Sequence, residues 1–554
     1  MTTSAPSIQA TAPRSFHAAH AWGAALAFLL CLPALLPLIV ILSASVVPEV
    51  AVWSHLTRFV LPEVIANTIK LVVGVALLAG TLGTLLAWLT AMCEFPGRKF
   101  FDWALLLPLA IPAYVLAFVA VGFLDYAGPL PTWLRSVFGP GSWFPPIRSA
   151  GGTIIVLSLA MYPYVYLLAR SAFLTQGRRA LEAAQALGLS SSKATWRVAL
   201  PMARPWITAG VALVCMETLA DFGAVSVFNY NTFTTAIYRA WFGMFSVSAA
   251  LELAGVLMIF VLLALALERR SRSAAHFASA RDVTRDAPRL ALGSWARWSA
   301  LGAIVSVFVL AFVLPMTQLL YWAVEHAARD LDMRYVGFVA RSLLLAGSAA
   351  VVVVAASVAL AYTLRRNSTP LARSMARVAT IGYAIPGTVL AIGILVPVIA
   401  VNNALQDVLK TWFGDSAPVL LLQSTLLTVL VAYLARFLAV GFNPVESGLQ
   451  RVTHSIDEVA ISLGVGGSAL LRKVHVPLLR TSLATAATLV FVDVMKEMPI
   501  TLITRPFGWD TLAVRVFEMT SEGEWERAAL PAVAIVLVGL VPAALLTRRG
   551  AHVA

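Results

Sequence analysis

The stretch Glu182–Pro201 reads Glu-Ala-Ala-Gln-Ala-Leu-Gly, then nine residues, then Val-Ala-Leu-Pro, and it is a polar, basic segment in a very apolar chain. The same pattern recurs once, in Glu458–Pro477. In both copies a Gly follows the Glu by six residues (Gly188 and Gly464), and a Pro follows it by nineteen. The two copies are separated by half the length of the 554-residue chain, so the sequence predicts a half-chain repeat with one such loop in each half.

The composition around these loops is that of a membrane protein. The chain is 60% hydrophobic and 12% charged, with a mean hydropathy of +0.85, whereas a soluble domain is about a quarter charged. A lipid bilayer is therefore the expected solvent. The net charge of +13 is spread over short loops. It does not form the single basic patch typical of nucleic-acid binding, which we exclude.

Runs of about 20 apolar residues, the length that crosses a bilayer, predict an all-α polytopic protein with about twelve transmembrane helices. The predicted spans are 22–46, 66–92, 103–124, 151–172, 205–226, 248–267, 299–323, 341–364, 378–400, 418–440, 481–503 and 528–547. Pro108, Pro112, Pro163, Pro386 and Pro397 fall inside spans. We expect them to be tolerated because neighbouring helices satisfy the freed backbone groups.

The orientation follows from the distribution of Lys and Arg. The run from Trp22 is longer than the ~7–15 apolar residues of a removed signal peptide, so it is interpreted as a retained first helix. Lys and Arg concentrate in alternate loops, among them both repeated loops. Such loops stay in the cytoplasm, so both termini are predicted to be cytoplasmic. Cys31, Cys93 and Cys215 lie in or beside apolar runs and are expected to pack in the core.

The predicted organisation has four segments. They are a cytoplasmic tail (1–21), a first six-helix repeat (22–268), a cytoplasmic linker (269–298) rich in Arg, Ser and Ala, and a second six-helix repeat (299–554). Ala-Ile-Pro at 110–112 recurs at 384–386. Six helices per half give both halves the same orientation, so the repeat is parallel, and a path between the halves is the natural place for a substrate.

Each repeated loop is expected to form a small helix–turn–helix at the membrane surface. Glu, Ala, Gln and Leu favour a helix, Gly188 ends it, and Pro201 is expected to stop the second short helix before the next span. An isolated loop of this kind would fit a helix lying on lipid as well as a docking site. Two copies with matched Gly and Pro spacing favour docking of a partner.

The repeated pattern resembles the "EAA" loop of membrane permeases of ABC importers. The first copy fits at Glu182, Ala183, Ala184, Gly188, Val198, Leu200 and Pro201. The second keeps Glu458, Ala460, Gly464, Val474 and Pro477 and departs at Val459 and Val476. The fused form, with the segments 219–223, 233–241, 491–499, 505–507 and 510–515, resembles ferric-iron permeases over nearly the whole chain.

This resemblance implies a type I ABC importer permease fold in a bacterial cytoplasmic membrane. It also implies a cytoplasmic ATPase dimer that docks on both loops and an extracytoplasmic binding protein that delivers the substrate. The chain contains no Gly-x4-Gly-Lys-Ser/Thr loop for binding phosphates. It is therefore predicted to be no enzyme, to need no cofactor, and to depend on a separate ATPase.

Ionisable residues inside the spans are the candidate path. Glu217 and Asp221 lie four residues apart, and Asp493 and Glu497 are their counterparts at the spacing that relates Glu182 to Glu458, with Lys496 beside them. Charged groups in a span face a cavity or a partner. They could line a translocation path for a hard cation, or Lys496 could pair with a carboxylate and hold helices in register. We expect no tightly bound metal, because a transporter must release its substrate.

Four further polar residues are open to two interpretations. Arg239 and Arg515 occupy matched positions in loops on the outer side, where they could dock the binding protein or extend to the interface. His454 and His475 lie in or beside the second loop, and they are interpreted as surface polar groups, with a sensor that titrates near neutrality as the alternative. The predicted function is an alternating-access permease, with ferric iron as the leading substrate. The alternatives are thiamine or another small solute, and an ion-coupled secondary transporter.

Overall fold

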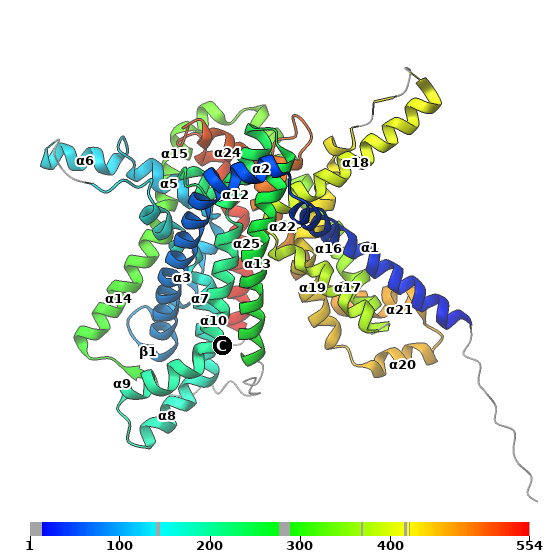
Figure 1. Ribbon diagram of the computed structural model, residues 1–554. Helices are drawn as coiled ribbons and strands as arrows, with labels where there is room; N and C mark the ends of the chain where they lie inside the picture. Colours follow the sequence, from blue (N-terminus) through cyan, green and yellow to red (C-terminus); the bar gives the residue numbers. More distant parts are fainter. Residues whose placement is uncertain are drawn as a thin grey trace, which may run out of the picture.

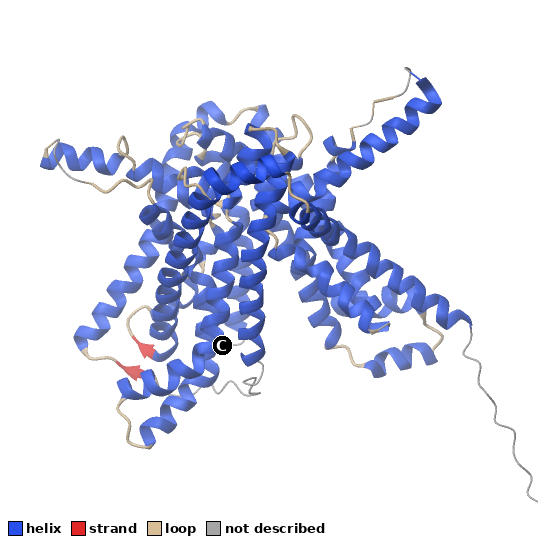
Figure 2. Ribbon diagram, viewed as in Figure 1, coloured by secondary structure: helices blue, strands red, loops and turns tan. Residues whose placement is uncertain are grey.

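A computed structural model describes residues 14–139, 144–275, 289–366, 369–414, 418–419 and 421–552. Regular structure in these residues is helical apart from one pair of two-residue strands, β1 (Cys93–Glu94) and β2 (Leu290–Ala291) (Figure 2). The α-helices up to the predicted linker are α1 (Arg14–Val46), α2 (Val50–His55), α3 (Leu61–Met92), α4 (Arg98–Ala104), α5 (Ala113–Leu124), α6 (Pro129–Phe138), α7 (Ala150–Ala172), α8 (Arg178–Ala186), α9 (Ser191–Ala194), α10 (Leu200–Ala220), α11 (Gly223–Val227), α12 (Phe233–Tyr238) and α13 (Val247–Ala275). Those after it are α14 (Ser294–Phe308), α15 (Leu314–Asp330), α16 (Met333–Arg366), α17 (Pro370–Ile381), α18 (Gly387–Phe413), α19 (Leu426–Gln450), α20 (His454–Ser462), α21 (Gly467–Leu470), α22 (Val476–Lys496), α23 (Pro499–Thr504), α24 (Leu512–Ser521) and α25 (Ala529–His552).

The all-α membrane fold predicted from the sequence is confirmed. Eleven helical segments within the described ranges are long and apolar enough to cross a bilayer. The twelfth predicted span falls in α25, in which the segment Ala529–Leu540 of the described residues is apolar.

Four prolines sit inside continuous helical runs, each two residues after a π-helical turn. These turns are η1 (Leu56–Val60) before Pro62, η4 (Thr195–Ala199) before Pro201, η7 (Val309–Val313) before Pro315, and η11 (Leu471–His475) before Pro477. A proline in a helix lacks an N–H and crowds the carbonyl of the preceding turn, and a π-helical turn is wider than an α-helical one. The prediction that Pro201 stops a helix is therefore wrong, because the chain runs as helix from α9 through Pro201 into α10.

Two predicted spans are broken, at matched places. The span 103–124 divides into α4, the 3-10 turn η2 (Leu107–Ala110) and α5, and the span 378–400 divides into α17, the 3-10 turn η8 (Gly382–Ala384) and α18. Each break lies at the repeated Ala-Ile-Pro, where the proline follows an extended Ile111 or Ile385. The prediction that helices tolerate these prolines is confirmed for Pro163 and Pro397, which lie inside helices. It is wrong for the prolines at the two breaks, because an extended residue before proline ends a helix.

The first helix of each predicted repeat packs against the other half. In α1, Ala27, Cys31 and Ala34 are buried against α16, α17 and α19. Conversely, Phe308 of α14 packs edge-on against Phe100 and Phe101 of the first half. The predicted repeats 22–268 and 299–554 are thus interleaved in space.

Both repeated loops lie at the same end of the molecule. Figure 1 shows α8 and α9 at the lower left and α20 and α21 at the lower right, with β1 and the end of α25 also towards the lower end. The helices α2, α12, α15 and α24 lie at the opposite end. This is the arrangement expected of a parallel repeat.

Helix occupies both ends of the predicted linker 269–298, because α13 runs to Ala275 and α14 begins at Ser294. Between them, β2 pairs in parallel with β1, and Arg289 lies 3.6 Å from the Glu94 carboxylate. The end of the linker is therefore attached to the first half. The remaining linker residues, 276–288, and residues 1–13 of the predicted tail lie outside the described residues.

A close helix contact at Gly83 gives a stability prediction. A Cβ on Gly83 of α3 would lie 2.7 Å from Val165 Cβ and 2.8 Å from the Tyr162 carbonyl oxygen, both in α7. Around Gly347 of α16 nothing lies within 4 Å of such an atom. We expect Gly83→Ala to destabilise the protein by about 1–3 kcal/mol. The matched Gly347→Ala should stabilise it by up to about 1 kcal/mol, because Ala favours a helix. Thermal unfolding in detergent measures both, and equal shifts would contradict this packing.

Candidate functional site

The first repeated loop forms the expected helix–turn–helix. In α8, Leu181 and Ala184 are buried, whereas Glu182 and Ala183 are exposed. Leu187 is 86% exposed just beyond α8. The exposed side of this loop therefore offers an apolar side chain to a partner.

The second loop repeats this surface with other residues. In α20, Ala460 is buried at the position of Ala184, and Glu458 is exposed like Glu182. Val459, where the pattern departs from Ala, is 58% exposed, and Leu463 is 75% exposed. The departure at Val459 therefore enlarges the exposed apolar face and leaves the buried face of the loop unchanged.

Both turns have a backbone conformation that favours glycine. Gly188 has φ +88° and Gly464 has φ +78°, a region that L-residues with a side chain rarely adopt. The bonds Leu189 N–H to Ala184 C=O (3.1 Å) and Val465 N–H to Ala460 C=O (2.8 Å) close the two turns alike. This is the left-handed C-cap of a helix, as the sequence predicted.

The remaining loop positions differ in exposure. Pro201 and Pro477 are exposed, and Leu200 is half-buried. His454 is exposed, as predicted. The prediction for His475 is wrong, because its side chain is completely buried. His475 is the buried residue of η11, whereas its position at the end of a polar loop in the sequence had suggested exposure.

The five charged residues predicted for the path lie where α10 and α22 end. Glu217 is in the last turn of α10 and Asp221 follows it, while Asp493 and Lys496 are in the last turn of α22 and Glu497 follows it. All five side chains are half-buried. Because α10 and α22 begin at the two repeated loops, each helix of 21 residues, about 30 Å long, connects one loop with one group of charges.

Asp221 and Glu497 have the same local role. Asp221 Oδ1 accepts hydrogen bonds from the Ala224 and Val225 N–H groups, at 3.0 and 3.3 Å. Glu497 Oε1 accepts one from the Ile500 N–H at 3.0 Å. These carboxylates therefore cap the short helices α11 and α23, which follow them.

Glu217 and Lys496 contact the broken helix of the opposite half. Tyr383 Oη, in η8 of the second half, donates to Glu217 Oε1 at 3.3 Å. Lys496 Nζ donates to the carbonyl oxygen of Leu109, in η2 of the first half, at 2.9 Å. Lys496 makes this bond with a backbone carbonyl freed by the helix break. Over the described part of the chain it forms no ion pair within 4.0 Å, and Asp493 accepts no hydrogen bond.

Arg436 is a central residue that the sequence interpretation missed. It lies in α19 and is 9% exposed. It donates to the carbonyl oxygen of Ile385 at the second helix break, and its guanidinium lies 5.4 Å from the centre of the Tyr383 ring. It is close enough to attract Glu217, Asp493 and Glu497. The sequence did contain an indication of this role, because Arg436 falls within the predicted span 418–440 and a charged side chain in a span has a high cost unless it has a partner.

Arg239 and Arg515 have unlike environments despite their matched positions. Arg239 is exposed and donates to the side-chain oxygens of Asn231 and Asn229. Arg515 is half-buried, lies 3.3 Å from the Glu518 carboxylate, and stacks near Phe338. Arg239 alone of this pair presents its charge to solvent.

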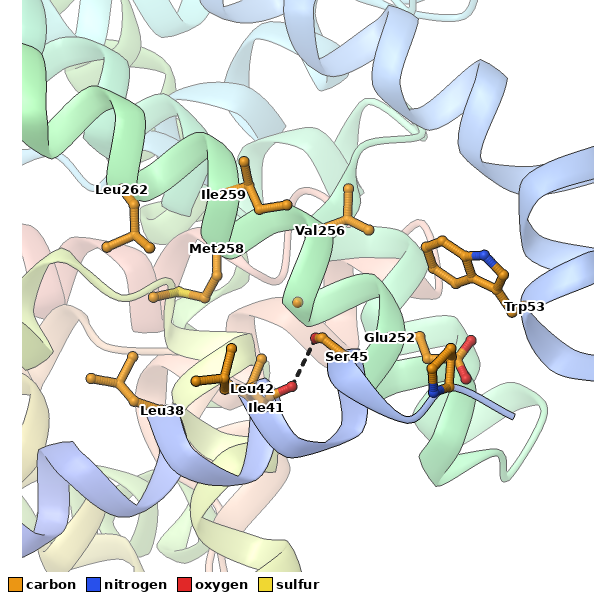
Figure 3. A pocket seen from close by; sticks show the side chains of 12 residues that line it. Leu38, Ile41, Leu42, Ser45, Trp53, Glu252, Val256, Met258, Ile259 and Leu262 are labelled. Atoms are coloured by element: carbon orange, nitrogen blue, oxygen red, sulfur yellow. Dashed lines mark hydrogen bonds between the residues drawn. The ribbon is translucent and has the colours of Figure 1, made fainter. Parts of the chain in front are cut away.

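A cavity of about 340 Å³ lies between α1 and α13, away from these residues (Figure 3). Its walls are mostly apolar, with Ser45 and Glu252 as polar residues, and Glu252 Oε1 accepts a hydrogen bond from the Glu49 N–H at 2.9 Å. It contains none of the predicted site residues, so its shape adds nothing to the path between the halves.

Comparison with known proteins gives a consistent result. Residues 79–268 and 351–549 each match the family described as binding-protein-dependent transport system inner membrane component. The Fe(3+)-transport system permease protein FbpB 2 of Haemophilus influenzae is 28% identical over 95% of this chain and 98% of its own length. The sulfate transport system permease proteins CysT and CysW of Escherichia coli are 27% and 34% identical over 35% and 29% of this chain, and 69% and 55% of their own lengths.

Proposed function

Because the chain belongs to the family of binding-protein-dependent transport system inner membrane components, we propose that it is a ferric-iron importer's permease subunit with two fused halves. Each of the two matched regions contains one repeated loop, so the two halves take the roles of two permease subunits. The iron assignment rests on the near full-length similarity to a Fe(3+)-transport permease. The sulfate permeases match about one third of the chain or less.

One observation above the others supports coupling of ATP hydrolysis to movement of the two halves. Each of α10 and α22 begins at an exposed loop and ends at a charged residue bonded to the opposite half's broken helix. An ATPase dimer that binds both loops and closes on ATP would move both helices. The Glu217–Tyr383 and Lys496–Leu109 bonds would then be the first contacts between the halves to change.

The assignment of sides follows from this mechanism. The end with the repeated loops and the chain termini faces the cytoplasm, and the end with α12 and α24 faces the binding protein. Hydrolysis of ATP belongs to the separate ATPase. The exposed Arg239 is the better of the two arginines for an ion pair with the binding protein, because Arg515 is already paired with Glu518.

Ferric uptake by the whole complex tests this function. The permease, its ATPase and its binding protein are placed in lipid vesicles, and uptake of radioactive ferric iron is measured with and without ATP. We expect ATP-dependent iron uptake that excess sulfate leaves unchanged. Uptake of another solute in place of iron would overturn the iron assignment. Uptake that continues with an inactive ATPase would favour an ion-coupled transporter.

A further inference from the structure

The second repeated loop is bound to the transmembrane core by a buried ion pair. Arg365, in the last turn of α16, donates from Nε to Asp457 Oδ2 of α20 at 2.7 Å. The Arg365 side chain is 8% exposed and the Asp457 side chain 16%. An ion pair so well shielded from water is screened little by salt.

The same arginine also holds the end of α19. Its Nη1 donates to the carbonyl oxygens of Leu449 (2.7 Å) and Val452 (2.9 Å), and its Nη2 to that of Thr453 (3.2 Å). The last carbonyls of a helix have no partner within the helix. Arg365 supplies a hydrogen-bond donor for these carbonyls, and its planar guanidinium thereby connects α16, α19 and α20.

His475 ties the loop to the start of α22. Its Nε2 lies 2.7 Å from Asp457 Oδ1, and its ring packs edge-on against Tyr362 of α16, with centroids 5.6 Å apart. Tyr362 Oη donates to the Gly467 carbonyl oxygen, at the start of α21, at 2.7 Å. The charged and titratable groups that face His475 are thus Asp457 from α20 and Arg365 and Tyr362 from α16.

The first loop has apolar residues at the matched positions. At the spacing that relates Glu458 to Glu182, the counterparts of Asp457 and His475 are Leu181 and Ala199, and both are buried. At the spacing that relates the two Ala-Ile-Pro segments, the counterpart of Arg365 is Ala91, also buried. The first loop is therefore held by apolar packing at places where the second is held by directed polar bonds.

The ionisation of Asp457 keeps these bonds complete near neutral pH. Burial opposes the charge, but the hydrogen bonds from Arg365 and His475 outweigh it and hold the pKa of Asp457 below its usual value. A carboxyl with a lowered pKa contributes its stability above the ordinary aspartate pKa of about 3.9. That contribution is lost only as the pH falls through the lowered value.

We propose that Asp457, Arg365 and His475 are positioning residues that lock the second ATPase-coupling loop to α16, α19 and α22. This inference rests on the proposed function, in which the ATPase binds both loops. The second half then follows the ATPase through directed polar bonds at three positions where the first half has the apolar residues Ala91, Leu181 and Ala199. The two halves of the fused chain are thereby coupled unequally to the two ATPase subunits.

Uncoupling in the complete complex tests the proposal. Permease, ATPase and iron-loaded binding protein are placed in vesicles, and iron uptake and ATP hydrolysis are measured together. We expect Asp457→Asn and Arg365→Gln each to lower uptake about tenfold, with ATP hydrolysis reduced less than about twofold. Arg365→Lys should restore part of the uptake, because it keeps the charge. Arg451→Gln, a change at an exposed arginine beyond α19, should leave both quantities unchanged.

Hydrogen exchange on the unmodified complex supplies a second measurement that needs no variant. Backbone amides of 454–475 should exchange more slowly than those of 178–199. Equal exchange, or an unchanged ratio of iron taken up to ATP hydrolysed in both variants, would overturn the positioning role. Failure of the unmodified permease to bind the ATPase would instead overturn the proposed function.

Discussion

Gly188→Pro combined with Gly464→Pro should reduce ATP-dependent uptake about 100-fold while the transmembrane helices remain folded. Both glycines have positive φ, whereas proline is held near −65° and costs about 3 kcal/mol or more where its conformation does not fit. A cost of that size corresponds to about a 100-fold loss of correctly formed turns. Both turns present the exposed residues that the ATPase would bind, so docking is lost with them.

The matched control is Gly188→Asn with Gly464→Asn. Asparagine enters the left-handed region more readily than other residues with side chains, and nothing lies within 4 Å of a Cβ at either position. We expect most of the uptake to remain. Co-purification of the ATPase with each variant, together with uptake in vesicles, gives the comparison. Full uptake by the double proline variant would show that these loops do not couple transport to ATP.

The largest effect on the path is expected from Glu217→Gln combined with Asp493→Asn. Arg436 lies within electrostatic reach of Glu217, Asp493 and Glu497, and Lys496 lies within reach of Asp493. The double change removes two of these three carboxylates and leaves one beside two cations. A hard cation prefers oxygen ligands with negative charge, and it would meet a cluster of net positive charge. We expect ferric uptake to fall at least about tenfold, equivalent to about 1.4 kcal/mol, with an unchanged unfolding temperature.

Asp221→Asn with Glu497→Gln is the comparison, because these carboxylates cap α11 and α23. Loss of a capping interaction costs about 1 kcal/mol, so this pair should lower the unfolding temperature more than the first. The two pairs therefore separate substrate contact from structural support. Unchanged uptake by the Glu217 and Asp493 variant would assign those residues to structure as well.

Much of the fold could be predicted from local sequence signals. The spans follow from apolar length, and the turns at Gly188 and Gly464 follow from a helix-forming run that ends in glycine. The breaks at the repeated Ala-Ile-Pro were present in the sequence but were interpreted as continuous spans. Proline had opposite effects at Pro112 and Pro201: a 3-10 turn breaks the helix before the first, and a π-helical turn carries it through the second.

The charged residues show where sequence interpretation ends. The sequence identified Glu217, Asp221, Asp493 and Glu497 as a repeated pair of carboxylates. Which of them cap a following helix depends on the backbone N–H groups that lie nearby. The partner of Lys496, the Leu109 carbonyl, lies 387 residues away in the sequence. No periodicity within one segment could identify it.

The sequence by itself determined a twofold, parallel, all-helical membrane protein with one glycine-hinged loop in each half, because apolar length, helix propensity and turn chemistry act over short stretches of chain. Only the tertiary structure decided that α1 and α14 pack against opposite halves and that Arg436 stands among the carboxylates. It alone decided that His475 is buried against Asp457 and Arg365. These features depend on contacts between segments that are distant in the sequence. Burial of a polar group in such a contact costs free energy unless the group is hydrogen-bonded or paired.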